Sequence, residues 1–271
     1  MKLLRKSCWL SIGIVLFTLV ACKESGIHPE IWLPNLNDTW QLQLRGLPNT
    51  TYAVKVYDLD LFDTPQETID MLKAQGKHVV CYFSAGSSEN WRADYSRFAA
   101  SDRGKKLHGW PGENWLDTRS NNVREIMLSR LDFARKKRCD GVDPDNVDGY
   151  ANNSGFPLDS AMQLDYNRFI ATAAHARDLS VALKNDIEQI ELLATVFDFA
   201  VNEQCNFYNE CDKYLAFTHQ GKPVFNVEYA SKYRRNTAGA RDKLCHSASS
   251  TKIRTLVLPL QLDDSFRYSC N

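Results

Sequence analysis

Residues 139–150 read CDGVDPDNVDGY, and the interpretation of the chain starts from this stretch. A run of strand length, residues 140–144, leads into a cluster of aspartates. Like charges packed this closely repel one another, so such a cluster usually serves a cation or a reaction. Asp143 and Asp145 are two residues apart and face the same way on an extended strand, and Pro144 marks the strand's end. The stretch therefore predicts a strand that presents functional carboxylates at its carboxyl end.

Similar runs alternate with helical periodicity along the chain. Strands are expected at 40–44, 53–58, 78–84, 140–144, 180–184, 197–202, 223–228 and 253–258. Apolar residues at three- and four-residue spacing predict helices at 66–75, 121–138, 159–178, 186–195 and 237–247. Pro65 and Asp159 look like helix starts and Gly76 like a helix stop. The pattern predicts the α/β class, as a single (β/α)8 TIM barrel. A doubly wound sheet is the alternative, but no glycine-rich turn follows the first strand.

The longest connection, residues 86–120, follows the third expected strand. Connections of this length in a compact domain are usually functional or carry small helices of their own. This one contains Trp91, Trp110 and Trp115, which are candidates for stacking on sugar rings or for core positions.

The N-terminus resembles an export signal. A basic start precedes the apolar run 10–20, which is shorter than the ~20 residues of a membrane span. Residues 19–22, LVAC, match a lipobox, so Cys22 is the expected lipidation site; a plain secretory signal or a retained anchor is the alternative. The expected division is a lipoprotein signal peptide at 1–21, a tether at 22–35 and the barrel domain at 36–271. We expect an exported protein, lipid-anchored (to the outer membrane in a Gram-negative cell) or secreted.

The charge balance is close to neutral. The chain has 33 basic and 33 acidic residues, and residues 1–21 hold three basic and no acidic ones, which leaves 30 against 33. A net charge of −3 argues against nucleic-acid binding. The remaining length suits one large domain, expected to be a monomer whose membrane contact is the lipid anchor alone.

Six cysteines follow Cys22, namely Cys81, Cys139, Cys205, Cys211, Cys245 and Cys270. An even number in an exported protein indicates disulfides, but six cysteines allow fifteen pairings. Cys205 with Cys211 would close a tight loop, and Cys245 with Cys270 would tie back the C-terminal tail. Cys81 and Cys139 would then remain, on strands expected to be neighbours. Zinc is disfavoured because neither CxxC nor paired histidines occur.

Polar residues recur where the expected strands end, the edge at which barrel enzymes carry their active sites. They are Gln41, Gln43, Asp58, Asp60, Tyr82, Ser84, Asp143, Asp145, Lys184, Asn185, Glu203, Glu228 and Tyr229. Single aspartates at strand ends often cap the next helix, and Asp60 and Asp186 have this alternative. Core packing does not explain the whole set.

Two carboxyl groups at strand ends indicate glycoside hydrolysis. One carboxyl group protonates the leaving oxygen, and the other, ionised, attacks or stabilises the sugar carbon. Asp145, with Asn146 beside it, and Glu203, which follows a strand of Phe and Val, are the predicted pair. Lys184 is expected to hold a carboxylate ionised or to bind a hydroxyl, with a structural ion pair as the alternative.

Other chemistries have weaker signals. Asp148 is expected to shape its loop; DxDNxD resembles a calcium loop, but the glutamate at the twelfth position is missing. Residues 84–87 lack the GxSxG elbow, no Walker loop occurs, and the histidines have no ligand spacing. No metal and no cofactor is therefore predicted.

Several motifs recur in the order known from one enzyme family. They are CYFSAG (81–86), ENWLDTR (113–119), DGVDPDNVDGY (140–150), LKN (183–185), NEQC (202–205) and EY (228–229). On these motifs the chain resembles glycoside hydrolase family 114, the endo-α-1,4-polygalactosaminidases, from about Trp32 to about Leu258.

The resemblance implies a (β/α)8 fold and endo-hydrolysis of α-1,4-linked galactosamine exopolysaccharide, including partly N-acetylated polymer. It places the acidic pair on Asp145 as nucleophile and Glu203 as acid/base, with retention of configuration. The substrate-binding residues would be Asp58, Tyr82, Asp117, Asp143, Asn146, Lys184, Asn185 and Glu228. Galactosamine is cationic near neutral pH, so an acidic cleft attracts it. The alternatives are a non-catalytic surface polysaccharide-binding protein and an α-glycosidase acting on neutral galactosides.

Overall fold

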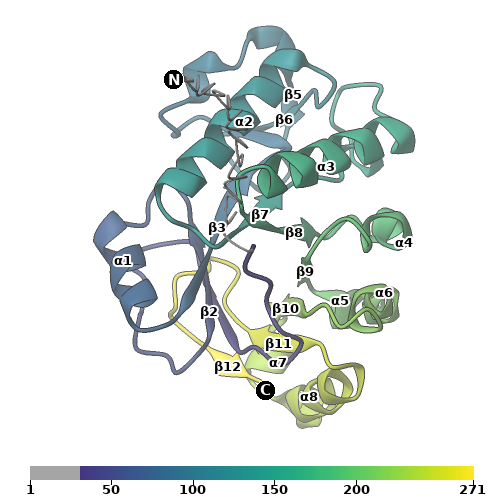
Figure 1. The fold of residues 1–271 in the computed structure, drawn as a ribbon. Coiled ribbons are helices and arrows are strands. Elements are labelled where there is room, and N and C mark those ends of the chain that lie inside the picture. The colour runs from purple at the N-terminus through teal and green to yellow at the C-terminus, as the bar shows by residue number, and fades with distance from the viewer. Residues whose placement is uncertain (1–30) are drawn as a thin grey trace, which may run out of the picture.

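A curled sheet runs through the molecule, with helices around its outside (Figure 1). The structure is a computed structural model and describes residues 31–271. Cys22, the predicted signal peptide and most of the predicted tether lie outside these residues, so they and the proposed domain limits stay predictions. In the described part of the chain, no helix has both the length and the apolar character that crossing a membrane requires.

The sheet has nine strands. In spatial order they are β1 (Trp40–Gln43), β2 (Val56–Asp60), β3 (His78–Ser84), β7 (Gly141–Asp145), β8 (Ser180–Lys184), β9 (Phe199–Glu203), β10 (Val224–Glu228), β11 (Arg254–Val257) and β12 (Tyr268–Ser269). The first eight pair in parallel, and β12 pairs antiparallel with β11. Every run that was expected to be a strand forms one of the eight parallel strands.

The helices are α1 (Gln66–Ala74), α2 (Asn121–Lys136), α3 (Ser160–His175), α4 (Ile190–Leu193), α5 (Cys205–Tyr208), α6 (Leu215–Thr218), α7 (Ser231–Arg234) and α8 (Ala240–Thr251). The predicted starts are confirmed: Pro65 is the N-cap of α1, and Asp159 Oδ1 accepts a hydrogen bond of 2.8 Å from the Met162 amide at the start of α3. Gly76, with φ of 70°, follows α1. The short helices α5, α6 and α7 were not predicted, because one turn leaves no periodicity to detect.

Successive side chains of each strand point alternately to the two faces of the sheet, and each face has its own core. Val56, Val80 and Ala182 belong to the core inside the curl, whereas Tyr57, Cys81 and Val181 face the outer core that contains the helices. Burial on both faces is why these strands read as nearly continuous apolar runs. The inward positions turn polar at the carboxyl ends of the strands, which places the site there.

The predicted closed barrel is not seen. No backbone ladder joins β1 to β11 or β12 in residues 31–271, so the sheet has a seam. Other contacts span it: Trp40 Nε1 donates to the Arg254 carbonyl at 2.9 Å, Arg267 Nε donates to Gln41 Oε1 at 2.6 Å, and the Leu44 amide donates to the Leu262 carbonyl at 3.0 Å. The fold is therefore an α/β fold with a curled sheet.

The connection between β3 and α2 builds a small antiparallel sheet of its own. Its strands are β4 (Ser87–Glu89), β5 (Arg103–Lys106) and β6 (Glu113–Leu116), in the order β4-β6-β5. The amides of Ala85 and Gly86 donate to the Asp145 carbonyl at 2.8 and 3.0 Å. A Cβ on Gly86 would lie 1.7 Å from the Asn146 carbonyl oxygen, so only glycine allows this approach. The small sheet is thereby fixed beside the end of β7.

Three disulfides are present: Cys81–Cys139, Cys205–Cys211 and Cys245–Cys270. The pairing is the one that the cysteine spacing suggested. The second bridge holds the turn just beyond Glu203 at the end of β9.

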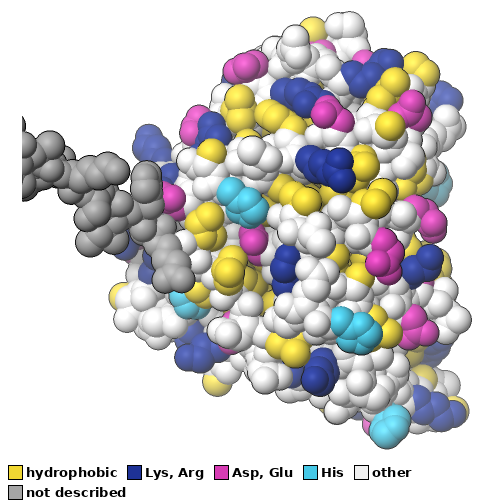
Figure 2. All heavy atoms as spheres, turned by 45° about the vertical axis from the view of Figure 1, so that its right-hand side comes forward, with side chains coloured by type: hydrophobic (Ala, Val, Ile, Leu, Met, Phe, Trp, Pro, Cys, Tyr) yellow, Lys and Arg dark blue, Asp and Glu magenta, His cyan; other side chains and the backbone are white. Residues whose placement is uncertain are grey.

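Charged side chains are mixed on the surface. On the face turned forward in Figure 2, basic and acidic groups are interspersed. This distribution gives that face no continuous basic patch of the kind that binds nucleic acid.

Candidate active site

A cavity of about 540 Å³ lies at the carboxyl ends of the central strands. Asp145, Lys184 and Glu203 line it from β7, β8 and β9. The connection between β3 and α2 supplies another wall, with Trp91, Trp110 and Trp115. Trp91 and Trp110 are among the exposed large apolar side chains, whereas Trp115 is buried. Polar groups in a cavity can bind hydroxyl groups, and aromatic walls can stack on sugar rings, so this cavity can hold a sugar chain.

Asp145 is surrounded by hydrogen-bond donors. The Tyr82 hydroxyl donates to Oδ2 at 2.8 Å, the Asn146 amide donates to Oδ1 at 2.8 Å, and Lys184 Nζ lies 3.7 Å from Oδ1. Burial, and then the Asp145 carboxylate, raise the pKa of Tyr82 well above its ordinary value, so the hydroxyl keeps its proton and remains a donor. These contacts fix the orientation of the Asp145 carboxyl group.

Glu203 lies two strands away and has a tyrosine of its own. The Tyr229 hydroxyl, just after β10, donates to Glu203 Oε1. Burial, and then the Glu203 carboxylate, raise the pKa of Tyr229 well above its ordinary value. The Glu203 amide donates to Asn185 Oδ1 at 2.9 Å, which ties the end of β9 to that of β8. No ion pair to Glu203 forms within the described residues, so the surroundings of the two carboxyl groups differ.

Lys184 is the buried cation of the site, 2 % exposed. Its Nζ lies 3.2 Å from Asp143 Oδ2 and 5.1 Å from the centre of the Tyr82 ring. Burial alone would lower the pKa of Lys184, but the carboxylates of Asp143 and Asp145 raise it well above its ordinary value. Lys184 therefore stays charged, and it compensates the acidic residues of β7.

Asp58 and Asp143 form a second layer beneath the cavity. Asp58 is 1 % exposed, and burial followed by the Asp143 carboxylate raises its pKa well above the ordinary range. Burial raises the pKa of Asp143 to about 6. Among the described residues no donor reaches either oxygen of Asp58 or Oδ1 of Asp143. Burial and the neighbouring Asp143 carboxylate therefore both favour the protonated form of Asp58.

Three of the strands that form the site are each followed by a residue with a positive φ angle. Asn146, Asn185 and Gln204 directly follow Asp145, Lys184 and Glu203, and their φ angles are 61°, 50° and 70°. A positive φ is uncommon outside glycine, although asparagine tolerates it. Such strained turns gather at functional sites, and here they stop each strand at the residue that faces the cavity.

The predicted substrate-binding residues separate into groups. Those that line the cavity are Tyr82, Asn146, Lys184 and Asn185. Asp58, Asp143 and Glu228 are buried away from it, and Glu228 Oε1 accepts from the Asn206 amide at 2.8 Å, so it holds the turn after Glu203. The position of Asp117 does not fit the predicted contact: Arg119 Nε binds its Oδ1 at 2.8 Å, and it does not line the cavity.

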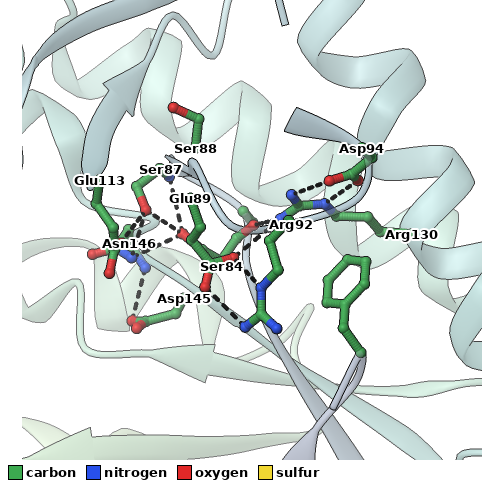
Figure 3. A network of polar contacts seen from close by, with 12 residues as sticks. Ser84, Ser87, Ser88, Glu89, Arg92, Asp94, Glu113, Arg130, Asp145 and Asn146 are labelled. Atoms are coloured by element: carbon green, nitrogen blue, oxygen red, sulfur yellow. Dashed lines mark hydrogen bonds and ion pairs between the residues drawn. The ribbon is translucent and has the colours of Figure 1, made fainter. Parts of the chain in front are cut away.

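The sequence did not predict several residues of the site. Glu89, Arg92, Glu113 and Tyr229 belong to the site or its hydrogen bonds. Figure 3 shows the network around Glu89 and Glu113, which includes Ser84, Ser87 and Arg92. Glu113 starts the motif ENWLDTR, which is a signal in the sequence, but the family resemblance points to the aspartate of that motif, Asp117. Tyr229 directly follows an expected strand, but the sequence gives no indication of its contact with Glu203.

Asp60 and Asp148 also line the cavity. Asp60 Oδ1 accepts from the amides of Phe62 and Asp63, both at 2.8 Å, and Arg92 binds the same carboxylate. Asp60 therefore orders the turn after β2, and the alternative of a helix cap is wrong, because the N-cap of α1 is Pro65. Asp148 lines the cavity, and burial raises its pKa to about 6.

Comparisons with known proteins agree with this geometry. A 44% identical solved structure, Aspergillus fumigatus Ega3 in complex with galactosamine, covers 89% of this chain and 98% of its own, with a TM-score of 0.84. The glycoside hydrolase domain of PelA from Pseudomonas aeruginosa is 17% identical with a TM-score of 0.66, covers 85% of this chain and 98% of its own, and shows a likeness in fold. An uncharacterized protein of Deinococcus radiodurans is 26% identical over 222 residues, 71% of this chain and 72% of that protein. The model of glycoside-hydrolase family GH114 matches residues 23–271, so the chain belongs to this family of glycoside hydrolases.

Proposed function

We propose that this glycoside hydrolase cleaves α-1,4-linked galactosamine polymers at internal bonds. The observation that carries the proposal is that Asp145 and Glu203 line one cavity from two strand ends, each with its own tyrosine donor. The 44% identity to Ega3, whose structure contains galactosamine, supports the sugar.

The proposed mechanism retains the configuration of the anomeric carbon. Glu203 gives its proton to the glycosidic oxygen while Asp145 attacks the anomeric carbon, so the glycosidic bond breaks and a glycosyl ester forms on Asp145. Glu203, now ionised, takes a proton from water, and the hydroxide displaces Asp145 from the sugar. Tyr82, the Asn146 amide and Lys184 support this assignment, because they stabilise the aspartate as it leaves with negative charge.

The finer statements about fold and location are also proposals. We assign the sheet to the (β/α)8 class, with the seam between β1 and β11 filled by side chains; its eight parallel strands support this. We place the protein outside the cytoplasm, attached through lipidated Cys22. The LVAC pattern supports the anchor, and three disulfides suit an oxidising compartment.

The test is cleavage of a partly deacetylated α-1,4-galactosamine polymer by the purified protein. Short oligosaccharides in mass spectra and an early drop in viscosity are expected, because internal cleavage shortens chains quickly. Asp145→Asn and Glu203→Gln should each lose at least ~10³-fold in kcat, as removal of a catalytic group does. Asp132→Asn, an equal charge change on the exposed face of α2, should keep full activity.

Each contrary outcome has a meaning. Binding without products would indicate a non-catalytic polysaccharide-binding protein. Faster cleavage of a neutral α-galactan would indicate an α-glycosidase for neutral galactosides. Undiminished activity of either carboxylate variant would refute the assigned pair, and a first product of the β configuration, seen by proton NMR, would refute retention.

A further inference from the structure

Glu113 is a buried carboxyl group without a cation of its own. It stands at the first position of β6, directly across from Glu89 on β4. Like charges in such a cross-strand pair are destabilising. Arg92 relieves Glu89 by two hydrogen bonds of 2.9 Å, whereas no ion pair to Glu113 forms anywhere in residues 31–271. The pair is therefore only half compensated.

The position of Glu113 is fixed from one side only. The Ser87 hydroxyl donates to Oε2 at 2.6 Å, so the Ser84 hydroxyl must donate to Ser87 Oγ at 2.7 Å, and Asn146 Nδ2 donates to Ser84 Oγ at 2.9 Å. The backbone amide of Asn146 also donates to the Asp145 carboxylate. The network therefore connects Glu113 to the end of β7 (Figure 3). Glu113 is 8 % exposed and lines the cavity, yet no group in the described chain donates to its Oε1.

A cationic substituent on the substrate would complete this arrangement. A sugar ring against Asp145 occupies the same cavity as Glu113, and the aromatic wall of Trp91 and Trp110 limits how the ring lies. We infer that Glu113 binds the ammonium group of a galactosamine unit and thereby selects amino sugars over neutral or N-acetylated ones. The inference rests on the proposed function, since it concerns the substrate of the same site.

The other acidic side chains near that wall already form ion pairs with Arg92. Asp60 and Asp63 both bind Arg92, as Glu89 does. Arg92 is 7 % exposed and receives three carboxylates, so it leaves them little attraction for a further cation. On that wall, Glu113 is the carboxyl group at which an added positive charge gains most, because charge-assisted hydrogen bonds are roughly twice as strong as neutral ones.

The pKa of Glu113 predicts how ligand binding should depend on pH. Burial raises its pKa to about 7, assisted by the charges of Glu89 and Asp145 and opposed by the Ser87 hydrogen bond and the charge of Arg92. Tyr82 faces the same space as a neutral donor. An ammonium ion beside Glu113 favours the ionised form. Binding of galactosamine below pH 7 should therefore release a proton, and affinity should fall about fivefold from pH 7 to pH 6 as Glu113 protonates.

The experiment measures binding by calorimetry in a Glu203→Gln background, which prevents turnover. The ligands are an α-1,4-linked galactosamine tetrasaccharide and its fully N-acetylated form. The parent should bind the amino form about 10- to 100-fold more tightly at pH 7, the range expected for one hydrogen bond to a charged group. Glu113→Gln should lose most of this preference and the proton release, with affinity for the acetylated form within twofold of the parent. Asp132→Asn serves as the charge-matched control and should keep both.

Stability is checked separately by thermal unfolding, and little loss is expected because the new amide oxygen in Glu113→Gln can still accept from the Ser87 hydroxyl. If Glu113→Gln fails to fold, Ser87→Ala replaces it, and this variant should reduce the preference by misplacing the carboxylate. An unchanged preference, unchanged proton release, or no binding of either ligand by the parent overturns the inference. A parent that prefers the amino form, together with a wild-type protein that cleaves no polymer, would instead refute the proposed function and leave the ammonium site standing.

Discussion

Tyr82 on β3 donates a hydrogen bond of 2.8 Å to Oδ2 of Asp145 on the neighbouring strand β7. Tyr229, just beyond β10, does the same for Glu203 on the neighbouring strand β9. Each carboxyl group is thus oriented by a tyrosine from the adjoining strand, and both tyrosines keep their protons because their pKa values are raised. The two reacting groups are held by rigid strands rather than by loops, which favours accurate placement.

Tyr82→Phe should lower kcat about 10- to 100-fold on the galactosamine polymer, because a hydrogen bond to a charged group contributes roughly 1.5–3 kcal/mol. KM should change little, since the hydroxyl acts on the carboxylate. Steady-state kinetics with reducing-end detection would measure both. Tyr57→Phe, which removes a hydrogen bond to the Tyr52 carbonyl on the outer face of β2, is the matched control and should keep its kcat. A large rise in KM with unchanged kcat would contradict the orienting role.

Lys184→Met should cost about 3–5 kcal/mol in the free energy of unfolding, because it leaves buried carboxylates uncompensated. Urea denaturation at pH 7 would measure this loss. Adding Asp143→Asn should restore part of it, since Asp143 is fully buried and lies 3.2 Å from Lys184. Strictly additive losses in the double variant would show that the two groups do not interact.

Removing Cys81–Cys139 should destabilise the protein by about 4 kcal/mol and removing Cys205–Cys211 by about 2 kcal/mol, because the closed loops differ in length. The sequence separations are 58 and 6 residues. Paired alanine variants compared by chemical denaturation would give the order. Equal losses would indicate that native contacts, rather than loop entropy, dominate.

The fold should be more stable at pH 5 than at pH 8. Several buried carboxyl groups have raised pKa values, burial being the largest cause: about 6 for Asp143 and Asp148, and about 7 for Glu113 and Asp186. A carboxyl group whose pKa is higher in the folded state stabilises the fold at low pH, and this contribution is lost as pH rises through the folded value. Asp102 and Asp140, whose pKa values are lowered, act below about pH 4 and so outside this window.

Thermal unfolding at the two pH values would test this expectation. Asp186→Asn should reduce the difference in Tm, because asparagine resembles the protonated acid and does not titrate. Asp165→Asn, at an exposed ion pair with Arg124, should leave the difference as in the wild type. A Tm that rises steadily from pH 5 to pH 8 would contradict the raised pKa values.

The strands were predictable because both of their faces are buried, so apolar runs mark them directly. Asp145, Lys184 and Glu203 were predictable because each is the polar residue that ends such a run. The different roles of Asp117 and Glu113 were not predictable, although only four positions separate these two residues. Asp117 is bound by Arg119, two residues away, while Glu113 meets Glu89 only through the pairing of β4 with β6. No local pattern encodes which of two acidic side chains finds a counter-charge in the folded chain.

The seam of the sheet has a consequence for the order of folding. β1 depends on contacts with Arg254, Leu262 and Arg267, and the bond from Trp40 to Arg254 already spans 214 positions of the sequence. The N-terminal strands alone therefore cannot shield the interior of this sheet, because the contacts across the seam come from the other end of the fold. Residues 254–271 are therefore expected to act as the closing segment of the sheet.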